Sequence, residues 1–397
     1  MRRQTLRNRL PVGLLAAMGL VLTAFAATAA PTPADDVGAL ARKGFAAMHA
    51  GEVAAASAAF EAAARVSDQP AMWWMRAGDV HLRAGEPEQA LAVWSEGVAA
   101  IPQAAETTVL LERIAFVAAR SGNVHHAALA EHRLVKALAR AVEAGRTSPM
   151  AWQHHQPLEQ RLQMHLALSA EMSAMSGEFT RAEKDARALI RRAPAAPDGY
   201  AALGYVLLQA AEFDDAIAAF DEALRLDPTH AAALNNLGTA FYMKHDLDAA
   251  EAQFEAVLSS PAANDRSQSI ALSNLAELLM LQGAYEDAER LYRDAIEACP
   301  DGAWSYMGLA ATYDVSGRYD EAINTMIDGW ERDSNGLSRV NTHFFQPEWA
   351  WQRDALIAEI EGEPKTAIAL WRKVAVGKVG ALVEAARYHL TALALDK

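Results

Sequence analysis

The chain has 397 residues, of which 52% are hydrophobic and 7% aromatic, and its formal net charge is −14. This acidic balance argues against binding to nucleic acid or anionic lipid, which calls for a basic surface, and favours neutral or basic partners. The only cysteine is Cys299, so an internal disulfide is excluded and stability must come from packing.

The first predicted element is a leader. Four arginines stand among the first nine residues, an apolar run covers 12–27, and the small residues Ala27, Thr28 and Ala29 follow. This layout is typical of a bacterial signal peptide, so we predict a signal peptide over 1–29 and a periplasmic protein. An uncleaved membrane anchor is the alternative, because the apolar run approaches the length that spans a bilayer.

A repeat follows the leader. Gly204 and Gly238 are 34 residues apart, as are Leu203 and Leu237, and the same frame fits nine units that start near residues 37, 71, 108, 163, 197, 231, 269, 303 and 348. The twentieth position of each unit is alanine: Ala56, Ala90, Ala127, Ala182, Ala216, Ala250, Ala288, Ala322 and Ala367. The fifteenth is glycine in seven units: Gly51, Gly85, Gly122, Gly177, Gly283, Gly317 and Gly362.

These columns have a physical meaning. Alanine lets two antiparallel helices cross closely, and glycine suits a turn with positive φ. The pattern resembles the tetratricopeptide repeat (TPR) family. The resemblance implies an all-α fold, a right-handed α-solenoid of about nine TPR-like helix pairs with a concave groove, interrupted here by two loops.

The units divide the chain into segments. We predict N-terminal TPR-like units over 37–144, a central array over 163–336, and a degenerate unit with a capping helix over 348–397. Interrupting loops are predicted over 145–162 and 337–347, each with a Gln-Pro pair close to its end, at Pro157 and Pro347.

The resemblance also implies a binding surface. In TPR proteins the first helix of each pair lines the groove, chiefly at unit positions 2, 5, 6, 9, 12 and 13. Carried over to this sequence, these positions predict contacts to a peptide or helix of a protein partner at Asn235, Asn236, Thr239, Tyr242, Asn274, Glu277 and Trp304. Asparagine amides can both donate to and accept from an extended backbone.

The two predicted loops carry further candidates for partner contact: Trp152, His154, His155, Phe344, Phe345 and Trp349. The histidines, with His165, Met164, Met172 and Met175, also permit a copper site, because imidazole and thioether are copper ligands. Helical spacing favours packing for the methionines, so we predict no metal.

The sequence contains no phosphate loop, nucleophile elbow, His-Glu-x-x-His or Cys-x-x-Cys motif. We therefore expect a non-catalytic adaptor or scaffold without a cofactor, acting in the assembly of envelope complexes. One alternative is a module of a polysaccharide export system, with Trp304 and Trp349 stacking on glycan. Another is a metal-handling protein. Fold alone does not choose among them.

Overall fold

A computed structural model describes residues 36–102, 106–146, 152–332 and 347–395 of the chain. These residues form 19 α-helices without a strand, and none of the helices is long and apolar enough to cross a membrane. The predicted signal peptide over 1–29 and residues 337–346 of the predicted loop over 337–347 lie outside the described residues.

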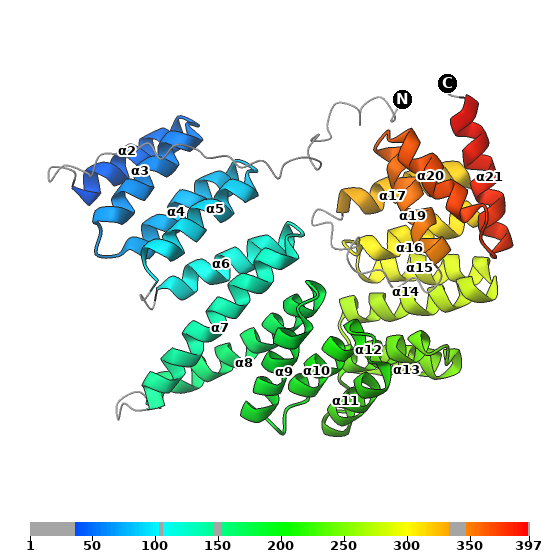
Figure 1. The fold of residues 1–397 in the computed structure, drawn as a ribbon, viewed down its shortest axis with the longest axis horizontal. Coiled ribbons are helices and arrows are strands. Elements are labelled where there is room, and N and C mark those ends of the chain that lie inside the picture. The colour runs from blue at the N-terminus through cyan, green and yellow to red at the C-terminus, as the bar shows by residue number, and fades with distance from the viewer. Residues whose placement is uncertain (1–35, 103–105, 147–151, 333–346, 396–397) are drawn as a thin grey trace.

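The helices follow one another in pairs round a broad curve, from α2 at one end to α21 at the other (Figure 1). Their bounds are α2 Val37–His49, α3 Val53–Val66, α4 Pro70–Arg83, α5 Pro87–Ala100, α6 Thr107–Arg120, α7 Val124–Arg146, α8 Trp152–Met175, α9 Phe179–Arg192, α10 Pro197–Gln209, α11 Phe213–Leu226, α12 Ala231–Met243, α13 Leu247–Ser259, α14 Asp265–Gln282, α15 Tyr285–Ala298, α16 Ala303–Val315, α17 Tyr319–Arg332, α19 Pro347–Ile360, α20 Pro364–Val374 and α21 Gly380–Leu395.

Nine helix pairs result, from α2/α3 to α19/α20, and α21 packs on α20, α19 and α16 at the C-terminal end. The predicted all-α solenoid of about nine pairs is confirmed. The alanine column explains the close crossing of the two helices in each pair, because all nine alanines have no exposed surface. We call the two members of each pair its first helix and its second helix.

The glycine column is confirmed by backbone geometry. All seven predicted glycines have φ between 71° and 78°, in the left-handed region. The two units without this glycine place Ala211 and His245 at the same position, both with φ of 62°. The turn therefore has the same shape in all nine units. In these two units the backbone is strained, because a residue with a Cβ atom rarely adopts positive φ.

Ala211→Gly is expected to raise the free energy of unfolding by about 0.5–1 kcal/mol, because relief of the left-handed strain exceeds the extra chain entropy of glycine. Urea unfolding followed by circular dichroism would measure it. Gly283→Ala, at the equivalent turn with φ of 77°, should shift stability in the opposite direction. Equal stability of all three proteins would contradict the strain.

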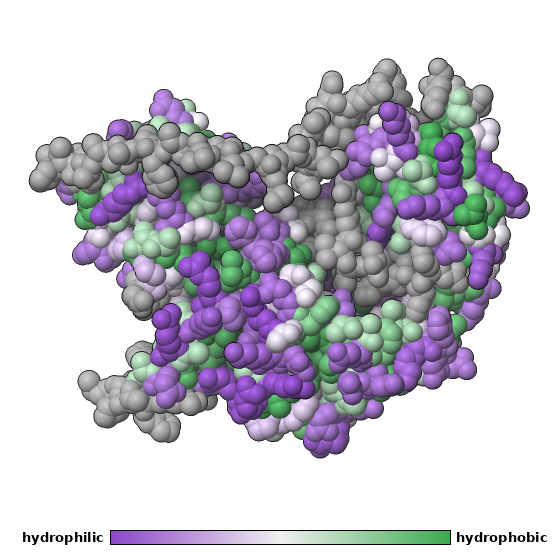
Figure 2. All heavy atoms as spheres, viewed as in Figure 1, coloured by the Kyte–Doolittle hydropathy of each residue, from purple (hydrophilic) through white to green (hydrophobic). Residues whose placement is uncertain are grey.

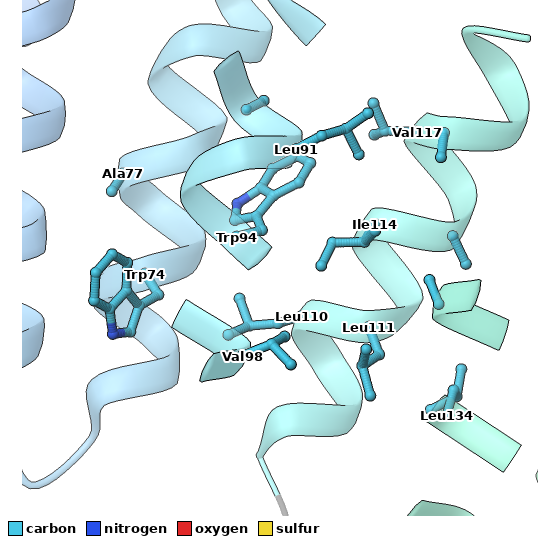
Figure 3. Packing of buried hydrophobic residues seen from close by; sticks show 14 of the residues in the cluster. Trp74, Ala77, Leu91, Trp94, Val98, Leu110, Leu111, Ile114, Val117 and Leu134 are labelled. Carbon is cyan, nitrogen blue, oxygen red and sulfur yellow. The ribbon is translucent and has the colours of Figure 1, made fainter. Parts of the chain in front are cut away.

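Large side chains of the second helices pack against glycines of the first helices. In the second unit this contact is reciprocal: Trp94 of α5 lies on Gly78 of α4, and Trp74 of α4 lies on Gly97 of α5. Figure 3 shows Trp94 facing the apolar side chains of α6, whereas Trp74 lies farther from them. The indole N–H of Trp94 donates to the carbonyl oxygen of Met75 at 3.1 Å, which satisfies its buried polar atom.

Gly78→Ala is expected to destabilise the protein by about 1–3 kcal/mol, because a well-packed core resists added volume. The new Cβ would stand 2.1 Å from Nε1 of Trp94, so the ring must move and its hydrogen bond is lost. Thermal unfolding measures the change. Gly380→Ala is the control, since its Cβ would meet nothing within 4 Å and its stability should stay within about 0.5 kcal/mol.

Buried apolar side chains of the described residues form five clusters. The largest runs through α2–α9, the next through α14–α21, and three smaller clusters connect α8 to α14. The core is therefore continuous in sequence order but narrow in the middle of the array, as expected when each unit contacts its neighbours.

The prediction of a loop over 145–162 is wrong for most of its length. α7 continues to Arg146 and α8 begins at Trp152, so Pro157 lies inside a helix. Proline at this place removes one backbone hydrogen bond near the helix start, and the packing of α8 on α7 outweighs that loss. The other Gln-Pro prediction holds, since α19 begins at Pro347.

Candidate functional site: the inner face of the array

The first helices line the inner side of the curve. Besides packing on their own partners, successive first helices contact one another, as α10 does with α12, α12 with α14 and α14 with α16. Because these first helices contact each other across unit boundaries, they lie on the inner, concave side of the curved array. A partner held by the concave side would therefore meet α2, α4, α6, α8, α10, α12, α14, α16 and α19.

The seven predicted groove residues come from three successive first helices, α12, α14 and α16. Five of them are buried: Asn235, Thr239, Tyr242, Asn274 and Glu277. Only Asn236 and Trp304 are half-buried. The predicted residues lie on three neighbouring first helices, but most of their side chains have little surface left for a partner.

The buried members connect neighbouring units instead. Asn235 Nδ2 donates to the carbonyl oxygen of Ser267 at 3.2 Å, and Tyr242 Oη donates to Glu277 Oε1 at 2.8 Å. Each bond joins α12 to α14. Such bonds satisfy polar atoms that burial would otherwise leave without partners, so they set how one unit stacks on the next.

Glu277 is an unusual carboxyl group. It borders a cavity of about 10 Å³ with Met280, Tyr292 and Trp349. Burial raises the pKa of Glu277 to about 8, against the smaller lowering effect of the hydrogen bond from Tyr242. The side chain is therefore mostly a neutral acid at pH 7.

Other residues offer the partly exposed surface that a partner needs. Ten large hydrophobic side chains are exposed among the described residues, and half of them belong to first helices. These five, which we call the inner apolar residues, are Val109, Phe116, Met164, Met243 and Ile270. Each occupies unit position 2, 9 or 13, which are groove positions of the family.

Among the inner apolar residues, Phe116 and Met164 are the most exposed, with 59% and 52% of their surface accessible. Apolar side chains left in water at repeated positions are typical of a binding surface. On the face drawn in Figure 2, hydrophobic areas appear as patches between hydrophilic residues. The sequence prediction did not include Val109, Phe116, Met164 or Ile270 in the groove, although their apolar character at groove positions was the signal that could have identified them.

The residues predicted to contact a partner from loops have mixed outcomes. Trp152, His154 and His155 fall in the first turns of α8, and their side chains lie outside the described residues, as do Phe344 and Phe345. Trp349 is only 4% exposed and belongs to the core formed by α14–α21. The prediction for Trp349 is therefore wrong, because the repeat places this ring inside the stack.

His165 has a partner within the fold. Its Nδ1 lies 2.9 Å from Glu131 Oε2, and both side chains are buried. Glu131 stands where other units carry a large apolar residue, so an ionisable pair replaces an aromatic contact between α7 and α8. The described residues hold no group of three His, Cys, Asp or Glu side chains arranged for a metal ion.

A second buried cluster closes the C-terminal end. His389 of α21 lies 2.9 Å from Asp314 of α16 through Nε2 and 2.8 Å from Glu359 of α19 through Nδ1. Its ring stacks on Trp371 with centroids 4.3 Å apart, and Gln352 donates to Asp314. Burial opposes a charge on the ring, but the two carboxylates outweigh burial and raise the pKa of His389 to about 9.

Models of the tetratricopeptide repeat family match residues 42–105, 174–231, 202–267 and 267–326. With nine helix pairs, the alanine crossings and the left-handed turns in place, the chain belongs to the tetratricopeptide repeat family. Arrays of these repeats are protein-interaction scaffolds, so the class of the molecule follows from the matches and the fold together.

Individual relatives are more distant. The chain is 29% identical over 201 residues to cellulose synthase operon protein C of Xanthomonas axonopodis pv. citri, covering 49% of this chain and 12% of that protein. It is 27% identical over 186 residues to tetratricopeptide repeat protein 21B of Mus musculus, covering 45% and 14%. A tetratricopeptide repeat protein from Parabacteroides merdae aligns with a TM-score of 0.46 at 14% identity, covering 70% of this chain and 98% of that one. The chain thus spans a small part of the curated relatives.

Proposed function

We propose that this protein is a non-catalytic scaffold of the periplasm that holds protein partners on the inner face of its repeat array, in the assembly of an envelope complex. The observation that carries the proposal is the position of the inner apolar residues. They are exposed on first helices at groove positions, and α6 and α8 alone contribute Val109, Phe116 and Met164.

The chemistry of this face suits a helix or an extended segment with apolar anchors. Apolar side chains contribute affinity when a partner removes them from water. Asn236 and Trp304, half-buried on α12 and α16, add an amide and an indole that can pair with polar groups of the bound segment. Stacking of TPR units creates such a surface without any catalytic group.

A matched pair of triple variants tests the proposal. One replaces Val109, Phe116 and Met164 by serine, and the control replaces Val66, Leu129 and Phe179, which are exposed on second helices. Each tagged protein is cross-linked in intact cells of the source bacterium, and the partners are quantified by mass spectrometry. We expect the first variant to lose its partners at least tenfold and the control to keep them. Equal recovery would refute binding on the inner face.

The periplasmic location rests on the arginine-rich, apolar leader over 1–29. Cell fractionation with N-terminal sequencing of the purified protein tests it. A mature chain that begins close to Ala30 in the periplasmic fraction supports the proposal. An intact Met1 in the cytosolic fraction contradicts it.

A second candidate function is a part in polysaccharide export. The similarity to cellulose synthase operon protein C favours it, and Trp304 is the remaining candidate for stacking on sugar rings. Calorimetric titration with cellohexaose, for the natural protein and for Trp304→Ala, tests this function. Binding that the alanine variant loses would support it, and heat no greater than dilution would exclude this glycan.

A further inference from the structure

α7, the second helix of one pair, and α8, the first helix of the next, form a hairpin of unusually long helices with a pocket at its base. α7 has 23 residues and α8 has 24, whereas α5 and α6 have 14 each. At a rise of about 1.5 Å per residue, α7 passes the start of α6 by more than two turns (Figure 1). The pocket lies where α7 and α8 pass the end of α5 and the start of α6, and its volume is about 670 Å³.

The pocket combines an apolar floor with a basic side. Val98, Leu111 and Leu138 are buried residues at its lining, from α5, α6 and α7. The cationic lining residues are Arg133, Lys136, Arg140 and Arg161, and the described lining includes no aspartate or glutamate. A strongly basic hollow of this kind is unexpected in a chain with a net charge of −14.

Three of the four cations are available to a ligand. Arg161 is paired with Glu112, which neutralises it. Arg133, Lys136 and Arg140 are exposed on α7, and the described part of the chain places no carboxylate in an ion pair with them. Their side chains follow one another at i, i+3 and i+7, so they lie along one face of the helix.

The spacing of these cations distinguishes a peptide from a point anion. Seven residues of helix span about 10 Å, a length that about three residues of extended chain also cover. A phosphate or a single carboxylate would meet one or two of the cations. A segment with several acidic side chains would meet all three, and one apolar side chain could enter over Val98 and Leu138.

We propose that this pocket binds an acidic segment of a partner protein that carries an apolar anchor residue. The inference rests on the proposed scaffold function and adds a second binding site to it, which α7 lines together with the end of α5 and parts of α6 and α8. It also assigns a purpose to the long α7–α8 hairpin. The acidic charge of the whole chain favours basic partners, whereas this pocket selects an acidic one.

Charge reversal on α7 tests the proposal. The pocket variant carries Arg133→Glu, Lys136→Glu and Arg140→Glu. The control carries Lys184→Glu, Arg187→Glu and Arg191→Glu on α9, which are exposed residues with the same spacing and the same change of charge. Helix content and thermal unfolding must match between the two. If the reversed protein fails to fold, glutamine at the same three positions replaces glutamate.

A displayed library of random dodecapeptides is the probe. Selection on the natural protein should enrich peptides rich in Asp and Glu that contain a large apolar residue. We expect these peptides to bind the pocket variant at least tenfold more weakly and the control unchanged, with affinity that falls as salt is added. Selected peptides without acidic enrichment, or with equal affinity for the pocket variant, would overturn the proposal.

Two further arms separate other outcomes. Displacement of the selected peptides by micromolar dodecanoate or inorganic phosphate would overturn the assignment to a protein segment and indicate a small anion. The triple serine variant of Val109, Phe116 and Met164 should keep the selected peptides. If this variant also keeps its cellular partners, the proposed function of the inner face is refuted, but the proposal for the pocket is not.

Discussion

His389→Ala is expected to lower the free energy of unfolding by about 3–5 kcal/mol, the usual cost of removing one member of a buried ion pair. The imidazolium lies between Asp314 and Glu359 and stacks on Trp371. Without it, the buried Asp314 and the half-buried Glu359, which belong to different helices, remain without their cation. Because the cluster joins α16, α19 and α21, the C-terminal helix should detach first. Urea unfolding at pH 6 and hydrogen exchange of α21 measure both effects.

The same cluster predicts a pH dependence of stability. The pKa of His389 is about 9 in the folded protein and about 6.5 when unfolded. Its contribution to stability is therefore fully present below pH 6.5 and lost as the pH rises through 9. His389→Ala should remove this slope. Arg387→Ala is the control, because Arg387 is exposed and two residues away, and it should change neither the stability nor its pH dependence. If the loss of stability between pH 6.5 and 9 persists without His389, this histidine is not its cause.

Glu277→Gln is expected to raise the free energy of unfolding by about 3 kcal/mol at pH 7. The pKa of Glu277 is about 8 in the folded protein, against an ordinary value of 4.5. The unfolded chain releases this proton first, so the natural protein loses stability as the pH rises from 4.5 to 8. Glutamine stays neutral at every pH and its oxygen can still accept the hydrogen bond from Tyr242.

Stability curves at pH 4.5, 6, 7 and 8 check the Glu277 prediction. The two proteins should have nearly the same stability at pH 4.5 and should separate progressively above it. Glu297→Gln is the control, because this exposed carboxyl lies on α15, away from the cavity. A constant difference at all four pH values would show that packing, rather than ionisation, distinguishes the variant.

The repeat itself could be predicted from sequence because its causes are local. Alanine at the helix crossing and glycine at the left-handed turn are each read within one unit, and the structure confirms them at Ala90 and Gly85. The loop predicted around Pro157 is wrong, because a proline near the start of a well-packed helix costs less stability than the Gln-Pro pattern suggests.

The site was harder to predict because its properties depend on contacts between units. The position of Glu277 in the repeat indicated the groove, but its burial and its bond to Tyr242 depend on how α12 stacks on α14. His389 and Asp314 are 75 residues apart, and a single sequence shows no sign of their pairing. The basic pocket arises only from helix lengths, which the predicted loop over 145–162 concealed.

The buried apolar core is smallest in the middle of the array, and this bears on how the array can bend. Two large apolar blocks, α2–α9 and α14–α21, are joined through three small clusters. The two turns with strained, non-glycine residues at Ala211 and His245 fall in this same connection. We therefore expect bending between the two ends to involve α10–α13, where the buried apolar clusters are smallest.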